Sequence, residues 1–456
     1  MIFRSRILKL HPATLVLSSF LLAITVGALL LKIPISTHPG HIPWVDALFT
    51  ATSAVCVTGL IVVDTGSYFT PFGQGVILAL IQMGGLGVMT IAVLLFKWIG
   101  RSISFRQRMA MQDLFAHTPR EDILGLVKGV VVLTITAEAI GALLLTIHWS
   151  REFPFLRALY TAIFHSVSAF CNAGFSIFPD SMMQYSDDLL LNMTMCGLII
   201  GGGIGFPVLH DLRSWIKFRK HQRQRLSIQT KTVLLTTLIL IVSGALMFAF
   251  LERQPLRDAP SFSHHILTPI FQSITCRTAG FNTVDISRLK EATLAMMIFL
   301  MFFGASPGSC GGGVKTTTLA LITVFMVSRI RRRRRVNIFK KSIPAETVTR
   351  SVSLILVSIG IIALILFLIL VGDAVSGRDD PAQAGFFLAC FFETVSAFGT
   401  VGLSMGVTPH LSTWGKCLIV LMMIIGRVGV LTFSYIVLRT GIANGIEHAE
   451  ENMMIG

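Results

Sequence analysis

The chain has 456 residues, of which 53% are hydrophobic and only 13% are charged, and its formal net charge is +15. A soluble protein has about 25% charged residues. This chain instead contains repeated apolar runs of about 20 residues, the length that crosses a hydrocarbon core of about 30 Å. The composition therefore excludes a soluble globular protein and predicts an all-α membrane protein.

The first apolar run extends from Leu15 to Leu31 and follows three basic residues, Arg4, Arg6 and Lys9. No small-residue cleavage site follows the run, so it does not have the pattern of a cleavable signal peptide. We expect this segment to stay in the protein as its first membrane helix.

Most of the 38 Lys and Arg residues lie in loops on one side of the predicted membrane, while most of the 23 acids lie in the opposite loops. The positive-inside rule then places the basic side and both termini in the cytoplasm of a multi-pass membrane protein. The run Arg331 to Arg335 flanks a membrane helix. Such a run is more typical of contact with anionic lipids or an acidic cytosolic partner than with nucleic acid.

Four segments share one pattern: each begins with Phe, passes through small hydroxyl residues, and ends with Gly followed by Leu or Phe. They are Phe49–Leu60, Phe164–Phe175, Phe271–Phe281 and Phe392–Leu403. The apolar runs before them are Leu15–Leu31, Leu124–Ile147, Thr232–Leu251 and Val352–Val371, and the runs after them are Val76–Trp98, Leu189–Leu209, Ala292–Val327 and Cys417–Leu438. Between them lie amphipathic stretches too short to span a bilayer.

This order predicts four tandem helix–pore-loop–helix repeats around a single pseudo-fourfold pore, with eight full spans and four re-entrant half-helices. The predicted repeats cover residues 12–100, 122–215, 229–335 and 348–441. Chance similarity between apolar segments is the alternative. It does not account for the same order of span, short helix and glycine in all four copies.

The closing glycine of each segment is the predicted selectivity filter. Non-helical backbone at membrane depth is tolerated where it lines a water-filled path, and rings of carbonyls can replace part of the hydration shell of an ion. Glycine permits the positive φ that such a turn needs. The residues before the glycines are uncharged, which favours carbonyl selection of K⁺ or a similar alkali cation. The filter set is Val57, Thr58, Gly59, Asn172, Ala173, Gly174, Thr278, Ala279, Gly280, Thr400, Val401 and Gly402.

Arg277 lies three residues before Gly280, where a positive charge inside the path would repel cations. We therefore expect its side chain to point behind the filter, support it structurally, and pair with an acid such as Glu393.

A glycine-rich stretch interrupts the third closing run, Ala292–Val327, which as one helix would measure about 54 Å. We expect this stretch to form an intramembrane gate loop below the filter, because Gly and Pro break helices and the other closing runs are also glycine-rich there. Its residues are Gly304, Ala305, Ser306, Pro307, Gly308, Ser309, Cys310, Gly311, Gly312, Gly313 and Lys315.

Arg427 is the only charge deep in the fourth closing run, and an intramembrane charge usually has a partner or a function. We expect it to donate hydrogen bonds to carbonyls of the gate loop and to form an electrostatic barrier. Packing between helices is the alternative role.

Other kinds of site have little support. Gly308 to Gly313 has the glycine spacing of a phosphate-binding loop, but Val314 stands where lysine is required. The seven cysteines form no C-x-x-C pair and lie in or beside apolar runs, which argues against a metal site and structural disulfides. We expect no enzymatic activity and no covalent cofactor.

The four filter segments and the loop from Gly304 to Lys315 resemble the Trk/Ktr/HKT superfamily of potassium transporters over about residues 12 to 440. The chain begins directly with its first span, so it is more similar to the Ktr-type translocating membrane subunit than to the longer Trk type. In that family a glycine in all four filters goes with potassium, whereas serine in the first goes with sodium, so Gly59 favours potassium. Cys310 departs from the usual Ser or Thr of the loop.

The resemblance also implies a location and partners: a plasma-membrane homodimer with one pore in each protomer, and a cytosolic RCK/KTN-type nucleotide-binding ring on the basic face. It maps a gating loop onto Gly304–Lys315 and a loop-contacting arginine onto Arg427. Sodium is a common activator in Ktr systems, although no residue here establishes it. The alternatives are a sodium-coupled secondary transporter of alkali cations, or a non-transporting scaffold or receptor subunit, which would not need four matched glycines.

Overall fold

The computed structural model describes residues 12–87, 123–218, 226–253, 262–333, 335–375 and 385–430. Within these ranges the chain is mostly helical, with non-helical segments between the helices. The named strands of the described residues are β1 (Asn337–Ile338) and β2 (Lys341–Ser342), which form an antiparallel hairpin. The helical content agrees with the predicted all-α class.

The helices fall into four successive stretches of similar order. The first contains α2 (Pro12–Lys32), the 3-10 helix η1 (Pro34–Ser36), α3 (Trp44–Cys56), α4 (Thr65–Tyr68) and α5 (Pro71–Leu86). The second contains α8 (Ile123–Trp149), α9 (Phe155–Phe170), η2 (Met183–Tyr185), α10 (Leu189–Ile204) and α11 (Phe206–Phe218). The third contains α12 (Ile228–Leu251), α14 (Phe262–Thr275), η3 (Ile286–Arg288), α15 (Glu291–Phe302) and α16 (Thr316–Ile330). The fourth contains α17 (Ala345–Val375), α18 (Phe386–Gly399), η4 (Thr408–His410) and α19 (Thr413–Val428).

The second helix of each stretch is short. Helices α3, α9, α14 and α18 have 13, 16, 14 and 14 residues, fewer than the roughly 20 that cross a hydrocarbon core. The phenylalanine that begins each repeated segment anchors its helix in the protein interior. Phe49, Phe164, Phe271 and Phe392 have exposed fractions of 0 to 1%.

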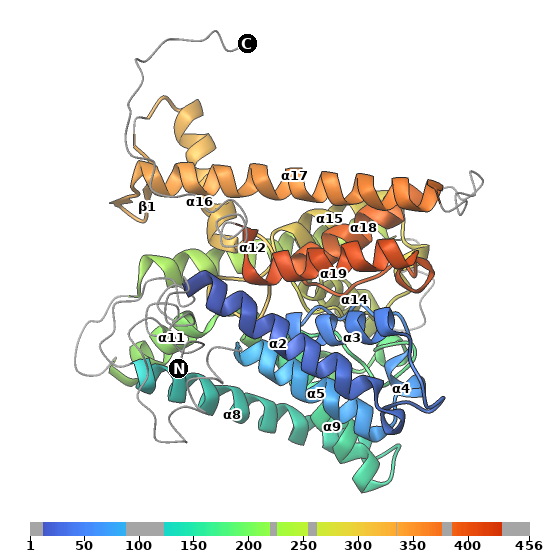
Figure 1. The fold of residues 1–456 in the computed structure, drawn as a ribbon. Coiled ribbons are helices and arrows are strands. Elements are labelled where there is room, and N and C mark those ends of the chain that lie inside the picture. Colours follow the sequence, from blue (N-terminus) through green and yellow to red (C-terminus); the bar gives the residue numbers. More distant parts are fainter. Residues whose placement is uncertain are drawn as a thin grey trace, which may run out of the picture.

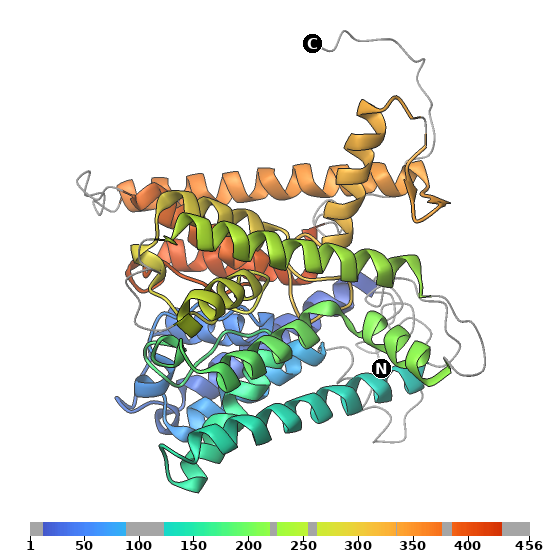
Figure 2. The same ribbon diagram turned by 180° about the vertical axis from the view of Figure 1, so that it is seen from behind.

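The four stretches contact one another in cyclic order. Helix α5 packs on α9 of the second stretch, α10 packs on α14 of the third, and α15 packs on α18 of the fourth. Helix α19 of the fourth stretch then packs on α3 of the first. The short helices are thus enclosed, and Figure 1 shows them between α17 on one side of the molecule and α8 on the other. The same arrangement is visible from behind, where α12 crosses in front (Figure 2).

The outer helices present apolar side chains away from the interior. On α17 the exposed fractions of five large apolar side chains are 41–64%: Leu356, Ile359, Leu364, Phe367 and Val371. Several Leu and Ile residues of α12 are also exposed. Large exposed apolar surfaces are unfavourable in water and are typical of helices that face lipid. The helical fold therefore has the character of a membrane protein.

Three helices in the described part of the chain are long and apolar enough to cross a membrane alone: Val127–Trp149 within α8, α12 and α17. The pair α10 and α11 would be a fourth, but it is bent by 100°. The second closing run, Leu189–Leu209, is therefore not one straight span, because its helix breaks at Gly205. The predicted ends of the first and fourth closing runs, Trp98 and Leu438, lie outside the described residues.

Glycine is the reason for this break. Gly205 has φ 98° and ψ 138°, and Gly87 and Gly429, which follow α5 and α19, have φ 83° and 96° with ψ 125° and 136°. Such positive φ values are accessible to glycine at little cost and are disfavoured for residues with a Cβ atom. Three closing helices therefore end in the same backbone conformation, which the sequence analysis predicted only as glycine-rich sequence.

Candidate functional site

The four glycines at the ends of the repeated segments meet in a closed ring. A Cβ atom added to Gly59 would lie 3.0 Å from the Cα of Gly174, and one added to Gly174 would lie 3.0 Å from the Cα of Gly280. The corresponding distance from Gly280 to the Cα of Gly402 is 3.3 Å, and from Gly402 back to the Cα of Gly59 it is 2.9 Å. The ring has no room for a side chain at any of these positions.

Each loop reaches the ring through the same backbone path. The residues two positions before the glycines, Val57, Asn172, Thr278 and Thr400, have φ values of 56°, 59°, 74° and 49°, and the glycines themselves have φ values of 70° to 95°. A left-handed conformation is a genuine outlier for β-branched residues such as Val57. Strain of this kind costs about 1–3 kcal/mol and persists where the surroundings determine it.

Backbone carbonyl groups follow the same cyclic order. The carbonyl oxygen of Ala279 lies 3.0 Å from a Cβ added to Gly174, and the carbonyls of Ala173, Val401 and Thr58 meet Gly59, Gly280 and Gly402 in the same way. Each glycine thus borders the carbonyl oxygen that precedes the glycine of its neighbour. The twelve predicted filter residues come together in this one assembly.

A hydroxyl group on each short helix holds the loop that follows, and the sequence analysis did not single these groups out. Ser53 Oγ and Ser396 Oγ accept hydrogen bonds from the backbone N–H of Gly59 (3.0 Å) and Gly402 (3.1 Å). In the other two loops the hydroxyl donates: Ser168 to the carbonyl of Phe175 (2.8 Å) and Thr275 to that of Phe281 (2.6 Å). All four lie four residues after the anchoring phenylalanine. This repeated position in the sequence could have identified them as loop-holding groups.

In three of the loops, the residue after the anchoring phenylalanine contacts the chain that follows the ring glycine. His165 Nε2 lies 3.0 Å from Ser176 Oγ, and Gln272 Nε2 donates to Thr283 Oγ1 at 3.2 Å. The Glu393 carboxylate accepts hydrogen bonds from the Ser404 hydroxyl, from the Thr408 hydroxyl at 2.8 Å and from the backbone N–H of Met405 at 3.1 Å. These contacts fix the chain just beyond the ring.

The predicted pairing of Arg277 with Glu393 is wrong. Arg277 Nη2 donates to Thr237 Oγ1 of α12 at 3.2 Å, and the Glu393 oxygens are occupied by the loop that follows α18. Arg277 is 7% exposed and points behind its loop, as expected. The carboxylate instead accepts hydrogen bonds from the chain that follows its own loop, from Ser404 to Thr408.

The loop between α15 and α16 lies directly against the ring assembly. The backbone N–H of Gly312 donates to Thr400 Oγ1 at 2.8 Å. The side chain of Thr278 contacts Gly304 and Gly311, so that added Cβ atoms at these glycines would overlap with it. Both threonines are the left-handed residues of their loops. The predicted gate loop is thus packed under two of the four loops.

Backbone hydrogen bonds attach the same loop to the second and fourth stretches. Ser306 N–H and Cys310 N–H donate to the carbonyls of Gly203 (3.1 Å) and Gly202 (3.2 Å), and the Gly308 carbonyl accepts from Phe206 N–H at 2.9 Å. Gly313 N–H donates to the carbonyl of Gly426 at 3.3 Å. The carbonyl of Gly202 and that of Gly203 are free to accept because their helix ends at Gly205.

Two cationic side chains hold the loop. Arg427 donates through Nη1 to the carbonyl of Cys310 and through Nη2 to the carbonyl of Gly84 at the end of α5. Lys315 Nζ donates to the carbonyls of Gly311 (2.7 Å) and Gly312 (3.3 Å). The predicted contact between Arg427 and the loop is present, and Gly84 is a further acceptor that lies 343 residues away in the sequence.

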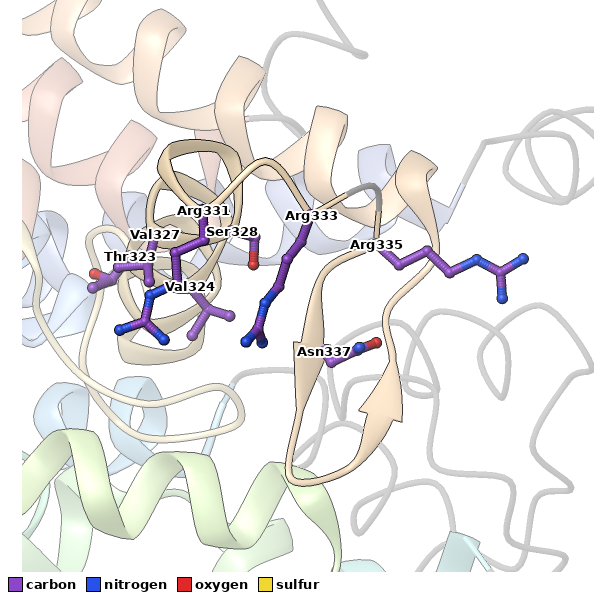
Figure 3. A pocket seen from close by; sticks show the side chains of 8 residues that line it. All are labelled: Thr323, Val324, Val327, Ser328, Arg331, Arg333, Arg335 and Asn337. Carbon is purple, nitrogen blue, oxygen red and sulfur yellow. The ribbon is translucent and has the colours of Figure 1, made fainter.

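A second group of basic residues surrounds a cavity of about 160 Å³ at the end of α16. Arg331 and Arg333 extend from the helix end into the same space, beside Ser328 and Asn337, whereas Arg335 extends away from it (Figure 3). Helix α16 begins at Thr316, immediately after Lys315, so it connects this cavity directly to the loop under the ring.

Comparison with known proteins gives a consistent result. The chain matches the family of TrkH cation transport proteins over residues 5–443. The Ktr system potassium uptake protein B of Bacillus subtilis (strain 168) is 39% identical over 441 residues, which cover 96% of this chain and 95% of that protein. The protein of the same description from Vibrio alginolyticus is 38% identical over 444 residues, which cover 97% and 94%.

The crystal structure of the potassium transporter TrkH from Vibrio parahaemolyticus has the same fold. It matches with a TM-score of 0.68 at 19% sequence identity, covering 94% of this chain and 84% of that chain. The resemblance to the Trk/Ktr/HKT superfamily, on which the four glycine segments and the loop from Gly304 to Lys315 depended, is confirmed by the sequence matches. This chain belongs to the TrkH family of cation transport proteins, which are ion transporters and not enzymes.

Proposed function

We propose that this chain takes up potassium through one pathway that passes along the ring of Gly59, Gly174, Gly280 and Gly402. The observation that supports it most is the closed cyclic contact of these four glycines, each beside a backbone carbonyl of its neighbour. The relatives at 38 and 39% identity are described as potassium uptake proteins, which supports potassium as the transported ion.

The ring binds K⁺ through peptide oxygens. Carbonyls from Thr58, Ala173, Ala279 and Val401 replace part of the hydration shell of the ion, and the partially negative C-terminal ends of the short helices favour a cation. The left-handed residues Val57, Asn172, Thr278 and Thr400 give each loop the turn that presents these oxygens. K⁺ is the substrate at the four glycines and not a resident cofactor.

In this proposal the chain consists of four tandem repeats, which together form eight spans and four half-helices around the pathway. The repeats are residues 12–100, 122–215, 229–335 and 348–441. The cyclic packing of α5 on α9, α10 on α14, α15 on α18 and α19 on α3 supports it. So do the matching backbone angles of the four loops.

The loop from Gly304 to Lys315 is the gate in this proposal. It lies against Thr278 and Thr400, and two cations, Arg427 and Lys315, donate to its carbonyls. Positive charge beneath a cation filter raises the barrier to permeation, since like charges in a low-dielectric environment repel strongly. Movement of the loop away from the ring would open the path.

The proposed setting is the plasma membrane, with both termini and the basic loops in the cytoplasm. The relatives are described as parts of a Ktr system, which supports a cytosolic RCK/KTN-type nucleotide-binding ring as regulator, and the proposed protomers form a homodimer. The cavity of Arg331 and Arg333 suits an acidic partner or an anionic lipid headgroup, and α16 connects it to the gate.

Rubidium uptake into proteoliposomes, with and without a sodium gradient, tests the proposal. We expect uptake that potassium inhibits, and Gly402→Ser should lower the preference for potassium over sodium. Gly406→Ser is the matched control, because Gly406 also has positive φ, 86°, but meets no atom within 4 Å of an added Cβ. Absence of uptake contradicts the proposal, and strict dependence on the sodium gradient would instead indicate a sodium-coupled transporter.

Replacement of Arg427 by alanine tests the gate. The change removes two hydrogen bonds to the carbonyls of Cys310 and Gly84, so basal flux should rise and regulation should weaken. Arg350→Ala is the control, because Arg350 is exposed and bonds only Glu346 of its own helix among the described contacts. Unchanged flux and gating in Arg427→Ala would leave only a packing role for this arginine.

A further inference from the structure

A small cavity lies immediately outside the glycine ring. It measures about 130 Å³ and is lined by fourteen residues, among them the four ring glycines. Its other walls carry hydroxyl and amide groups from Ser176, Ser181, Asn282 and Ser404. One water molecule occupies about 30 Å³ in the liquid, so the cavity has room for a cation together with several waters.

Among the fourteen described residues that line this cavity, Asp64 alone has an ionisable side chain. Its Oδ1 accepts hydrogen bonds from the backbone N–H and the hydroxyl of Ser67, at 2.7 and 2.6 Å, which fixes the carboxylate at the start of α4. No Lys, Arg or His of the described residues lies within 4.0 Å of it as an ion-pair partner. Its negative charge is therefore not neutralised by a neighbour in that part of the chain.

The third stretch provides a natural contrast. Asp285 follows Gly280 by five residues, as Asp64 follows Gly59, and it likewise accepts hydrogen bonds from the backbone N–H and hydroxyl of a nearby serine, Ser287. However, Asp285 is paired with Arg288 at 3.1 Å and does not line the cavity. The two acids share one structural role and differ in their charge environment.

We propose that the cavity is an outer binding site where a hydrated monovalent cation waits before entering the ring, and that Asp64 concentrates cations there. This inference rests on the proposed function of the ring. A single acid in the wall of a cavity surrounded by low-dielectric protein focuses the field and raises the local cation concentration. The serine and asparagine groups around it can replace water molecules one at a time as the ion moves toward the carbonyls.

The negative charge of Asp64 can be removed while its hydrogen bond at the start of α4 is kept. Asp64→Asn keeps a side-chain oxygen that accepts the Ser67 N–H, because Asn and Asp are equally good N-cap residues. Rubidium uptake is measured over a range of rubidium concentrations at low and at high ionic strength set with choline chloride. We expect KM to rise about three- to tenfold at low ionic strength, the effect of one partly screened charge, with Vmax unchanged.

Salt dependence separates an electrostatic role from a structural one. In the wild type, added choline chloride should raise KM, and Asp64→Asn should abolish most of this dependence, because screening acts only where a charge is present. Asp64→Glu should restore a low KM, and Asp285→Asn should behave as the wild type.

Two results would overturn the inference while leaving the ring proposal intact: a wild-type KM and salt dependence in Asp64→Asn, or a loss of Vmax alone, which would indicate a structural cap. A wild-type protein without rubidium uptake would overturn the proposed function itself, and the outer site with it.

Discussion

The glycine ring and the loop beneath it are built in opposite ways. The ring receives one similar segment from each of four stretches, and its four loops share left-handed residues at matching positions. The loop from Gly304 to Lys315 comes from one stretch alone; at the corresponding place the second stretch has only the break at Gly205 between α10 and α11. It is held by α5, α10 and α19 through the carbonyls of Gly85, Gly202 and Gly426.

This difference fits the roles proposed for the two parts, a constrained filter and a movable gate. In the ring, each glycine is confined by the next, so a change in one loop is resisted by its neighbours. In the loop, the contacts are hydrogen bonds to helix ends and to two cations, and each can be exchanged for water or another partner at a modest net cost of about 0.5–1.5 kcal/mol. The proposed function therefore combines a ring held by mutual packing with a gate loop whose individual contacts can be released.

The largest expected effect comes from Gly402→Ala. Its added methyl group would lie 2.9 Å from the Cα of Gly59 and would overlap with the Thr58 carbonyl, at a residue with φ 90°. Overpacking costs about 1–3 kcal/mol and a left-handed conformation about 1–2 kcal/mol more. Rubidium uptake should fall at least about tenfold, whereas Gly406→Ala should retain it; equal activity of the two variants would contradict a tightly closed ring.

Thr400→Val should act next most strongly, and on the loop. Valine is tolerated in this conformation, since Val57 occupies the equivalent place in the first loop with φ 56°. The change leaves the buried N–H of Gly312 without its acceptor and costs the packed position of the loop about 1–3 kcal/mol. The equilibrium between the packed and the released loop then shifts by about 5–150-fold. Basal rubidium flux should rise accordingly.

The control for this change is Thr394→Val, because Thr394 donates only to the Cys390 carbonyl of its own helix among the described contacts. A rise of flux in both variants would show that the effect is not specific to the loop.

A smaller difference is expected within the ring. Ser53→Ala leaves the Gly59 N–H without an acceptor, at a cost of about 1–3 kcal/mol, while Ser168→Ala removes one donor from the Phe175 carbonyl. A carbonyl has two lone pairs and tolerates the loss better. Potassium selectivity, measured by sodium competition, should therefore decrease more in Ser53→Ala. The opposite order would show that the carbonyl contacts dominate.

The smallest effect is expected for Cys310→Ser. Cys310 Sγ donates to the Gly85 carbonyl at 3.4 Å, and serine keeps a donor in a shorter side chain. Rubidium flux and thermal stability should stay close to those of the wild type, with a change in the free energy of unfolding below about 1.5 kcal/mol. A large change in flux would mean that the sulfur atom itself sets the position of the loop.

Much of the site could be predicted from the sequence because its key positions depend on residue type. Only glycine adopts the ring conformation without strain, so Gly59, Gly174, Gly280 and Gly402 could be identified from their common place after a phenylalanine and small hydroxyl residues. The interruption from Gly304 to Gly313 could be predicted for a similar reason, since Gly and Pro do not continue a long helix. Arg427 was a candidate because an intramembrane charge needs a partner.

The partners themselves were decided only by the tertiary structure. Arg277 meets Thr237 instead of Glu393, and Arg427 reaches Gly84 as well as the loop, although these pairs lie 40 and 343 residues apart. The break of the second closing helix at Gly205 is likewise stabilised by the loop packed against it, through the hydrogen bond from Phe206 to Gly308. Residue type limits the conformations of a segment locally, but which groups satisfy a buried donor or acceptor depends on segments brought together by folding.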